Sequence, residues 1–467
     1  MRIKALWWKL VILGGVTLLL MIVLARIGWL VDERQQRQRA AEAGVAAAQA
    51  GPQVVLGPLV QRNCNEQWIP PDPREQPQRR DFVLSALPAQ LVVDGTLNQE
   101  RRVRGQFKIN GYAGTLTMDA RWATLAALTP SAQHGGKVSC DDMRVVVAFS
   151  DSRGLRSVAI KRGTDALSIE PGTGNDNYPR GLQAPLRGLK LDDPLELTVS
   201  VSLVGMSDFG LVPAASATQV KLRSDWPHPS FGGRFLPVTS RVDATGFEAT
   251  WQVSELATTA LRDVRAGRSL PTVDRDADAD MPYAMPAKVP SDGKGATITD
   301  ALAFSMIDPV NPYVMSDRAI KYGLMFIVLT FVSVGLLELL AGRRVHPVQY
   351  LLVGLAMTLF FLLLLSLSEH LSFAMSYALA CAAAIGLLTF YGASMLGSWW
   401  RGLGFGALVA TLYGALFVLL NLEKAALLVG ALLLFSILAA VMTLTRRIDW
   451  YELGLGGRIL NSEGEST

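Results

Sequence analysis

Six apolar runs limit how this chain can fold. The first, LVILGGVTLLLMIVLARIGWL, extends from Leu10 to Leu30. A helix rises about 1.5 Å per residue, so about 20 apolar residues cross a hydrocarbon core about 30 Å thick. Five further runs are long enough to do the same: Ala319–Leu340, Val348–Leu367, Leu371–Leu396, Leu403–Leu420 and Ala425–Thr445. The sequence therefore predicts an integral membrane protein with six transmembrane helices.

The first run can be read as a cleaved signal peptide or as a permanent anchor. Signal peptides have an apolar region of about 7–15 residues, followed closely by a small-residue cleavage site. Here the run is longer, and the stretch Ala46–Ala50 lies beyond the charged segment DERQQRQR. We therefore expect an anchor helix over 10–30. A juxtamembrane helix should follow over 31–50 and stop at Gly51-Pro52, because proline cannot continue a helix.

Basic residues gather at alternate ends of the apolar runs. They are Arg2, Lys4, Lys9, Arg343, Arg344, Arg401, Arg446 and Arg447, whereas the opposite loops carry only SEH and NLEK. Short loops rich in Lys and Arg remain in the cytoplasm. The pattern predicts cytoplasmic segments at 1–9 and 446–467, a periplasmic domain at 51–316 and a five-helix bundle at 319–445.

The overall charge is small for a chain of 467 residues. Lys and Arg number 44 and Asp and Glu number 40, which gives a net charge of +4. The basic residues do not form the stripe typical of nucleic-acid-binding proteins. We expect the lipid bilayer as a partner and no nucleic acid. A further envelope protein or lipid partner is unknown, and a homo-oligomer is left open.

Residues 51–316 change from helical to strand-like patterns. Segments such as LVVDGTL, LELTVSVSL and TQVKLRS alternate apolar and polar residues or carry β-branched ones. Gly, Pro, Asn and Asp separate them at intervals typical of antiparallel sheets. No strand–helix–strand alternation is visible, so a large all-β, sandwich-like domain is predicted. Within it, residues 271–299 lose the pattern and are expected to form a flexible loop.

The stretch DWPHPSFGG contains the first candidate site, formed by Asp225, Trp226, His228 and Phe231. His228 could act as a base or metal ligand oriented by Asp225, but such chemistry needs further convergent groups and none is adjacent. The favoured interpretation is a rigid connection between the strands TQVKLRS and RFLPV, because two prolines fix the backbone around His228. Trp226 and Phe231 would pack beneath this connection, or they would face a partner or the membrane surface.

Ionisable residues close to the transmembrane spans are further candidate functional residues. Glu338 lies about one helical turn before Arg343 and Arg344, so we expect an ion pair with these arginines at the membrane interface. His346 lies in RRVHPVQY on the predicted cytoplasmic face. Arginine pairs beside aromatic residues at such positions normally anchor the topology and contact anionic lipid.

Glu369 and His370 lie together at the predicted periplasmic edge. With His228 they would make a sparse zinc-binding set. Adjacent residues on a helix end point in different directions, however, and this differs from the ligand spacing of HExxH. The sequence therefore assigns no catalytic residue, no cofactor and no metal.

Two further features concern packing. Cys64 and Cys140 lie in the predicted periplasmic domain, where oxidising conditions permit a disulfide, but sequence alone leaves the bridge open. In the fourth span, small residues recur every four positions, which favours close packing of another helix. These residues are Ala378, Ala382 and Gly386.

Several longer motifs resemble the CreD family of bacterial inner-membrane proteins. They are AGPQVVLGPL, LSIEPGTG, SDWPHPSFGGRFLP, DRAIKYG, HPVQYLLVG, LLLLSLSEH and IDWY, in the family's order over nearly the whole chain. Ala50 departs from the family pattern, which has serine there. The resemblance implies a cell-envelope integrity protein of Gram-negative bacteria in the CreBC two-component regulon, linked to envelope stress and to colicin or β-lactam tolerance. It implies no catalytic residues or ligand site.

The expected function is therefore non-enzymatic support of the envelope through the β-domain and the helix bundle. One alternative is a membrane-embedded enzyme that acts on envelope material through His228, Glu369 and His370. Another is a transporter or channel through the bundle at 319–445, although the spans lack the broken-helix pattern of secondary transporters.

Overall fold

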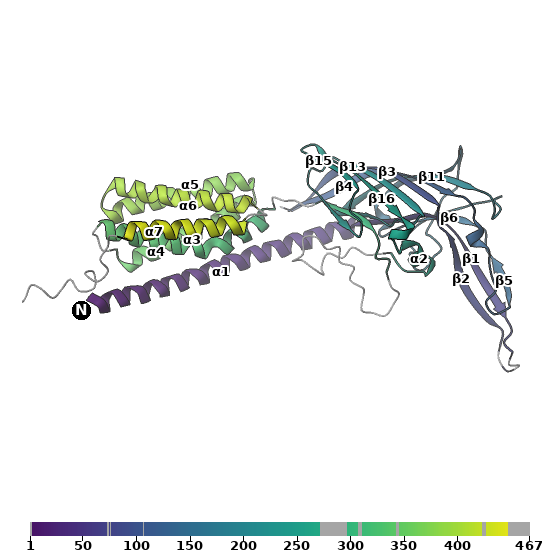
Figure 1. The fold of residues 1–467 in the computed structure, drawn as a ribbon, viewed down its shortest axis with the longest axis horizontal. Helices are drawn as coiled ribbons and strands as arrows, with labels where there is room; N and C mark the ends of the chain where they lie inside the picture. Colours follow the sequence, from purple (N-terminus) through teal and green to yellow (C-terminus); the bar gives the residue numbers. More distant parts are fainter. Residues whose placement is uncertain are drawn as a thin grey trace, which may run out of the picture. The chain divides into compact units, whose positions relative to one another are not determined.

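The computed structural model describes residues 2–71, 74, 76–105, 107–270, 297–306, 311–341, 345–422 and 426–446. The chain divides into two compact units. Unit 1 comprises Met1–Gln38 and Val310–Thr467 and is helical, whereas unit 2 comprises Arg39–Pro309 and is built mainly of strands (Figure 1). Of the loop predicted at 271–299, residues 271–296 lie outside the described residues.

Six helices account for the six predicted spans. They are α1 (Arg2–Ala48), α3 (Pro312–Ala341), α4 (Pro347–Ser368), α5 (Phe373–Leu396), α6 (Trp399–Asn421) and α7 (Ala426–Thr445). The first five are long and apolar enough to cross a membrane, and α7 adds a shorter apolar stretch at Leu428–Thr443. The predicted anchor and juxtamembrane helices form one continuous helix, α1, which belongs to unit 1 up to Gln38.

One face of α1 packs into unit 1. Leu20, Leu24, Ile27 and Val31 are at most 6% exposed. Their spacing of three or four residues places them on one side of the helix. Leu20 approaches Gly354 so closely that a Cβ at this glycine would lie 2.1 Å from the leucine side chain. The anchor is therefore part of the helical core of unit 1.

Helices α5 and α6 meet at glycines that the sequence did not single out. A Cβ at Gly402 would lie 2.6 Å from Ala393, and one at Gly406 would lie 2.0 Å from the hydroxyl of Thr389. The predicted small-residue stripe is instead exposed on unit 1: Ala378, Ala382 and Gly386. The described helices of this chain therefore meet at other faces, and the packing of another helix on the stripe stays a prediction.

Unit 2 contains two sheets, and the predicted all-β, two-sheet architecture is confirmed. The nine-stranded sheet has the order β14-β17-β12-β1-β6-β10-β9, with β2 and β5 also paired to β1. Its strands are β1 (Gln53–Trp68), β2 (Gln78–Ala86), β5 (Lys137–Cys140), β6 (Arg144–Phe149), β9 (Glu170–Pro171), β10 (Gly181–Pro185), β12 (Asp208–Leu211), β14 (Pro229–Gly233) and β17 (Leu302–Met306).

The eight-stranded sheet has the order β15-β16-β13-β3-β4-β11-β7-β8. Its strands are β3 (Gln90–Arg104), β4 (Phe107–Trp122), β7 (Leu155–Arg162), β8 (Asp165–Ala166), β11 (Leu195–Met206), β13 (Ala217–Ser224), β15 (Thr239–Asp243) and β16 (Gly246–Ser254). A short helix, α2 (Ala260–Arg265), follows β16. The main core contains large buried side chains such as Tyr112, Phe149, Phe209, Trp251 and Phe304.

Two strand predictions need correction. The pairs β1–β12 and β13–β3 are parallel, not antiparallel. In each pair the chain between the two strands returns to the same end of the sheet before the second strand begins. RFLPV is not a strand: Pro229–Gly233 within DWPHPSFGG forms β14, and the next strand begins at Thr239. Phe235 makes only an isolated bridge, and Pro237 has no N–H for a ladder.

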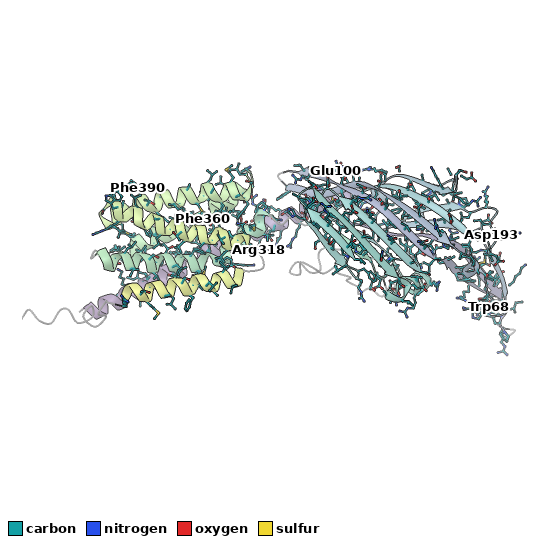
Figure 2. All side chains as sticks on the ribbon, turned by 45° about the horizontal axis from the view of Figure 1, so that its top comes forward. Trp68, Glu100, Asp193, Arg318, Phe360 and Phe390 are labelled. Atoms are coloured by element: carbon teal, nitrogen blue, oxygen red, sulfur yellow. A yellow bond between two sulfur atoms is a disulfide. The ribbon has the colours of Figure 1, made fainter. Side chains whose placement is uncertain are left out.

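Strand β1 extends beyond the main sandwich together with β2 and β5. Cys64 lies opposite Cys140 in the β1–β5 pair, and a disulfide joins them. Figure 2 shows Trp68, the last residue of β1, and Glu100 at opposite ends of unit 2. The disulfide therefore links strands near the end of unit 2 that carries Trp68.

Candidate functional site

The aromatic residues of DWPHPSFGG belong to the core of unit 2. Trp226 is 4% exposed, and its Nε1 donates a hydrogen bond of 2.8 Å to the carbonyl of His228. Phe231 packs edge-on against Phe247 and Trp251, with ring centroids 5.5 and 5.7 Å apart. Trp226 is buried and Phe231 is partly buried against the core, which agrees with the interpretation that both rings pack beneath the connection.

The two polar residues of the stretch do not form an acid–base pair. Oδ1 of Asp225 accepts a hydrogen bond of 2.6 Å from the backbone N–H of Gln99. The His228 ring lies edge-on to Trp226 at 6.2 Å. The geometry is that of a fixed backbone corner. No group of three or more His, Cys, Asp or Glu side chains suited to a metal ion occurs within the described ranges.

Glu338 does form an ion pair, but with a different partner from the one predicted. The Lys9 ammonium contacts both carboxylate oxygens, with 2.6 Å to Oε2, and the Tyr350 hydroxyl donates to Oε2 at 2.9 Å. Lys9 also lies 5.5 Å from the centre of the Tyr350 ring. We call these three residues the Lys9 cluster. The predicted partners, Arg343 and Arg344, lie outside the described residues.

Glu369 pairs with a basic residue of α1. Nε of Arg34 lies 3.5 Å from Oε1 of Glu369, whose side chain is 13% exposed. Nearby, Nδ2 of Asn311 donates to Oε1 of Gln38 at 3.4 Å. We call Arg34 and Glu369 the Arg34 cluster. His370, the next residue, is exposed. The carboxylate therefore balances a cation of α1 instead of belonging to a metal set.

The two clusters lie on the same face of α1. Lys9 and Arg34 are about 25 residues apart, which is about seven helical turns and about 37 Å. This distance lies between the thickness of the hydrocarbon core, about 30 Å, and that of the whole bilayer, about 40–45 Å. Each cluster is therefore at a height where one membrane interface is expected, and together they fasten α1 to α3 and α4.

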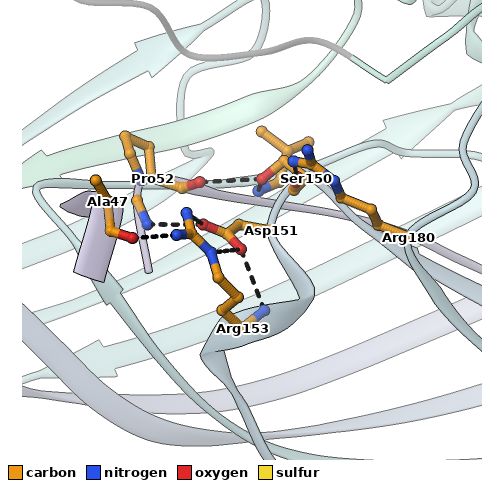
Figure 3. Close-up of polar contacts among 8 residues, drawn as sticks. Ala47, Pro52, Ser150, Asp151, Arg153 and Arg180 are labelled. Carbon is orange, nitrogen blue, oxygen red and sulfur yellow. Dashed lines mark hydrogen bonds and ion pairs between the residues drawn. The ribbon is translucent and has the colours of Figure 1, made fainter. Parts of the chain in front are cut away.

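A third cluster holds the end of α1 inside unit 2 (Figure 3). Nη2 of Arg153 donates to Asp151 at 2.6 Å, and the backbone N–H of Gly51 donates to the same carboxylate at 3.1 Å. Arg153 also donates to the carbonyl of Ala47, in the last turn of the helix. A cation is favourable beside helix C-terminal carbonyls. We call Asp151 and Arg153 the Asp151 cluster.

The Asp151 carboxylate remains ionised over a wide pH range. Burial by itself would raise its pKa. Hydrogen bonds from Arg153 and from the Gly51 N–H, together with the charge of Arg153, outweigh this effect and lower the pKa from 3.8 to about 2. Ser150 completes the junction, since its hydroxyl donates to the carbonyl of Pro52 at 3.0 Å.

His346 caps a helix. Its Nδ1 accepts a hydrogen bond of 3.3 Å from the N–H of Val348, and its own N–H donates to Oε1 of Gln349 at 3.0 Å. With Pro347 at the first position of α4, this is a capping box. The order His-Pro-Val-Gln could have indicated it from the sequence. His346 therefore positions the start of α4, close to Tyr350.

Sequence reasoning missed four of the residues that hold α1: Lys9, Arg34, Asp151 and Arg153. Lys9 and Arg34 carry a usable signal, because the two cations share one face of a predicted helix with the buried leucines. Asp151 and Arg153 carry none, since they lie about 100 residues away from the helix end that they bind.

Two comparisons with known proteins each cover nearly the whole chain. A sequence profile of the family described as "Inner membrane protein CreD" matches residues 5–451. The inner membrane protein CreD of Escherichia coli (strain K12) is 31% identical over 453 residues. The aligned region covers 96% of this chain and 95% of that protein. All three clusters lie within the matched residues.

Proposed function

The chain belongs to the CreD family of inner membrane proteins, and from this premise we propose that it supports cell-envelope integrity without catalysing a reaction. The proposal places both termini in the cytoplasm and residues 51–316 in the periplasm, in agreement with the positive charges at alternate span ends. Its benefit to the cell would be tolerance of envelope stress, such as that caused by colicins or β-lactams.

One observation supports a structural role for the charged groups. Near both ends of the membrane-spanning part of α1, they pair with residues of α3 and α4 and so hold these helices together. Lys9 pairs with Glu338, and Arg34 pairs with Glu369. Removal of one partner from a partly buried pair leaves an uncompensated charge, which is strongly destabilising. Groups paired in this way fix the position of α1, which supports a structural role for them.

Helix α1 then connects the membrane to the β-domain as a single element. Its 47 residues correspond to a length of about 70 Å. The Lys9 and Arg34 clusters fix it within unit 1, and the Asp151 cluster fixes its last turn within unit 2. In the proposed function, forces that act on the β-domain reach the membrane bundle through this helix.

The proposal is tested by complementation of a strain that lacks its own family member. The wild-type chain should restore tolerance of a colicin or a β-lactam. The double variant Lys9→Met/Arg34→Met should lose most of this tolerance at equal membrane abundance, because α1 is released from the bundle. A chain that restores no tolerance, or a double variant that is fully active, would contradict the proposal.

The same strain separates this function from the enzyme alternative. His228 and His370 are exposed, so His228→Ala/His370→Ala should leave the fold intact and should retain full tolerance. Selective loss of tolerance at normal abundance would instead favour an envelope-modifying enzyme. Substrate-dependent flux through vesicles that contain the purified protein would favour the transporter alternative.

A further inference from the structure

The hairpin that joins β3 to β4 ends in a basic segment. Residues 100–108 read ERRVRGQFK and contain four basic residues and one glutamate. The adjoining turns of α1, residues 39–48, add one arginine and one glutamate and therefore no net charge. Unit 2 as a whole is nearly neutral, since residues 39–309 contain 29 Lys and Arg and 30 Asp and Glu. We call residues 100–108 the basic hairpin end.

One face of the basic hairpin end lies against α1. Both elements belong to unit 2, which includes α1 from Arg39 onwards. Arg102 lines a small cavity together with Gln49, which directly follows the helix. A Cβ at Gly44 would lie 2.1 Å from Nη1 of Arg104. From Arg102 to Arg104 the hairpin therefore moves back along α1, towards the membrane-spanning part of this helix.

The other face of the basic hairpin end is exposed. Successive residues of a strand point to opposite faces, so Arg101 and Val103 lie on the side away from α1. Arg101 is exposed, and its guanidinium has no ion-pair or hydrogen-bond partner within the part of the chain that the structure describes. Val103 is 69% exposed. By contrast, Arg102 pairs with Glu100 at 2.5 Å. The exposed face thus combines an unpaired cation with an apolar side chain.

Helix α1 brings this segment close to the expected membrane surface. Gly44 lies ten residues beyond Arg34 on the same continuous helix, and Arg34 lies where one membrane interface is expected. Ten residues of helix rise about 15 Å, of which the headgroup layer accounts for about 5–7 Å. The remaining distance of about 10 Å is similar to the Debye length, about 8–10 Å at physiological ionic strength. Attraction between the arginines and charged headgroups therefore acts across it.

We propose that the basic hairpin end binds anionic phospholipid headgroups of the leaflet from which α1 emerges. Arg101 and Arg104 pair with phosphate oxygens, because a guanidinium matches phosphate with two parallel hydrogen bonds. Val103 contacts the apolar part of the interface beside them. Each basic residue close to an anionic surface favours the bound state about fivefold. The lipid surface is then a second connection between the membrane and unit 2, in addition to α1.

An acidic protein would also offer negative charge to these arginines. Lipid is favoured because α1 tethers the basic hairpin end to the bilayer, so that headgroups are present at a high effective concentration in every molecule. The same argument holds for either leaflet and does not involve stress tolerance. The inference therefore goes beyond the proposed function and can fail without it.

Contact with headgroups is measured on the full chain in nanodiscs. A fluorophore is attached at Val103→Cys in a Cys381→Ser background, since the other two cysteines are joined in the disulfide. The lipid is phosphatidylcholine, alone or mixed with phosphatidylglycerol, and includes a trace of phosphatidylcholine with a nitroxide quencher on its headgroup. We expect at least twofold stronger quenching in the anionic nanodiscs. The difference should disappear in about 1 M salt, where the Debye length is about 3 Å. Equal quenching in the two lipids would overturn the inference.

Matched variants separate the position of the charge from its amount. In the labelled chain, Arg101→Gln/Arg104→Gln should abolish the dependence of quenching on lipid charge. Arg121→Gln/Lys161→Gln removes the same charge from exposed positions at the other end of the eight-stranded sheet and should keep the dependence. A fluorophore at Ile69→Cys, where the side chain is 79% exposed beside Trp68, should be quenched little in either lipid. Equal behaviour of the two double variants, or equal quenching at the two labelled positions, would overturn the assignment.

Discussion

At the scale of single residues, Glu338 is a candidate functional residue whose contacts give it a structural role. A lone carboxylate near a span suggests proton or ion chemistry. Here it accepts from Lys9 and Tyr350 in one compact group, and only 15% of its side chain is exposed. Its surroundings supply the opposite charge and the hydroxyl that an ionised carboxylate needs. We conclude that Glu338 fixes α1 against α3 and α4.

A double-mutant cycle measures this contact. Glu338→Gln and Lys9→Met should each lower the free energy of unfolding by about 1–3 kcal/mol, since each leaves a partly buried charge unpaired. The double variant should lose less than the sum, with a coupling of about 1 kcal/mol or more. Thermal unfolding of the full chain in nanodiscs provides the measurement.

The control for this cycle is an exposed pair on the same helix. Lys321 and Asp317 are one turn apart on α3, and the lysine side chain is 72% exposed. Their cycle should give a coupling of only about 0.3–0.5 kcal/mol, because solvent screens the charges. Strict additivity at Lys9 and Glu338 would show that the Lys9 cluster does not hold the helices.

The Asp151 carboxylate makes stability depend on pH. Its pKa is about 2 in the fold, compared with an ordinary value of 3.8. A lowered pKa gives a stabilisation that is fully present above the unfolded value and is lost as the pH falls towards the folded value. We expect Asp151→Asn to cost about 1 kcal/mol near pH 5, after allowance for solvent screening, and almost nothing near pH 2.

Hydrogen exchange of peptides from β1 and β6 in the full chain measures this difference. The comparison of variant and wild type at each pH removes the effect of other carboxylates with lowered pKa values, such as Glu66. Burial by itself would raise the pKa of Glu66, but backbone N–H groups of His134, Gln133 and Gly136 lower it to about 2. A penalty for Asp151→Asn that stays constant across this pH range would contradict the role of its charge.

At the scale of elements, the contact between α5 and α6 depends on glycine. Gly402 lies so close to the backbone of Ala393 that any side chain would force the helices apart. Within a bilayer, close approach of helices at small residues replaces the hydrophobic effect as a source of stability. The packing is therefore determined by Gly402 of α6 against Ala393 of α5, and not by the stripe of Ala378, Ala382 and Gly386 on α5.

Two leucine substitutions on α6 test this contact. Gly402→Leu should separate α5 from α6 and should lower thermal stability and membrane abundance strongly. Gly404→Leu is the matched control, because a Cβ there meets nothing within 4 Å. It should leave both properties nearly unchanged. Equal effects of the two substitutions would mean that the observed crossing is not the one that stabilises the bundle.

At the scale of the whole molecule, the proposed function requires one sidedness. Arginines at alternate span ends predict that the N-terminus and the C-terminal tail stay in the cytoplasm. A periplasm-dependent phosphatase fused near residue 200 should therefore be active, and the same enzyme fused after Arg446 should be inactive. The opposite pattern would remove the periplasmic role of the β-domain.

Local patterns in the sequence determined the elements and the class of the fold. Runs of about 20 apolar residues fix the spans, because a bilayer accepts only segments whose backbone is satisfied internally. Alternation fixed most strands, and Gly51-Pro52 marked the end of α1, which the structure places at Ala48. These signals come from residues that are close together in the sequence. The elements can therefore be predicted without knowledge of the tertiary structure.

Tertiary structure alone decided which distant groups meet. Lys9 and Glu338 are 329 residues apart, and their pairing depends on how α1 packs against α3 and α4. The parallel pairing of β13 with β3 decides that Gln90 lies beside Ala217, although the two residues are far apart in the sequence. The spacing of apolar residues within one helix or strand does not predict such contacts. Which remote segments meet depends on how all the helices and strands pack together.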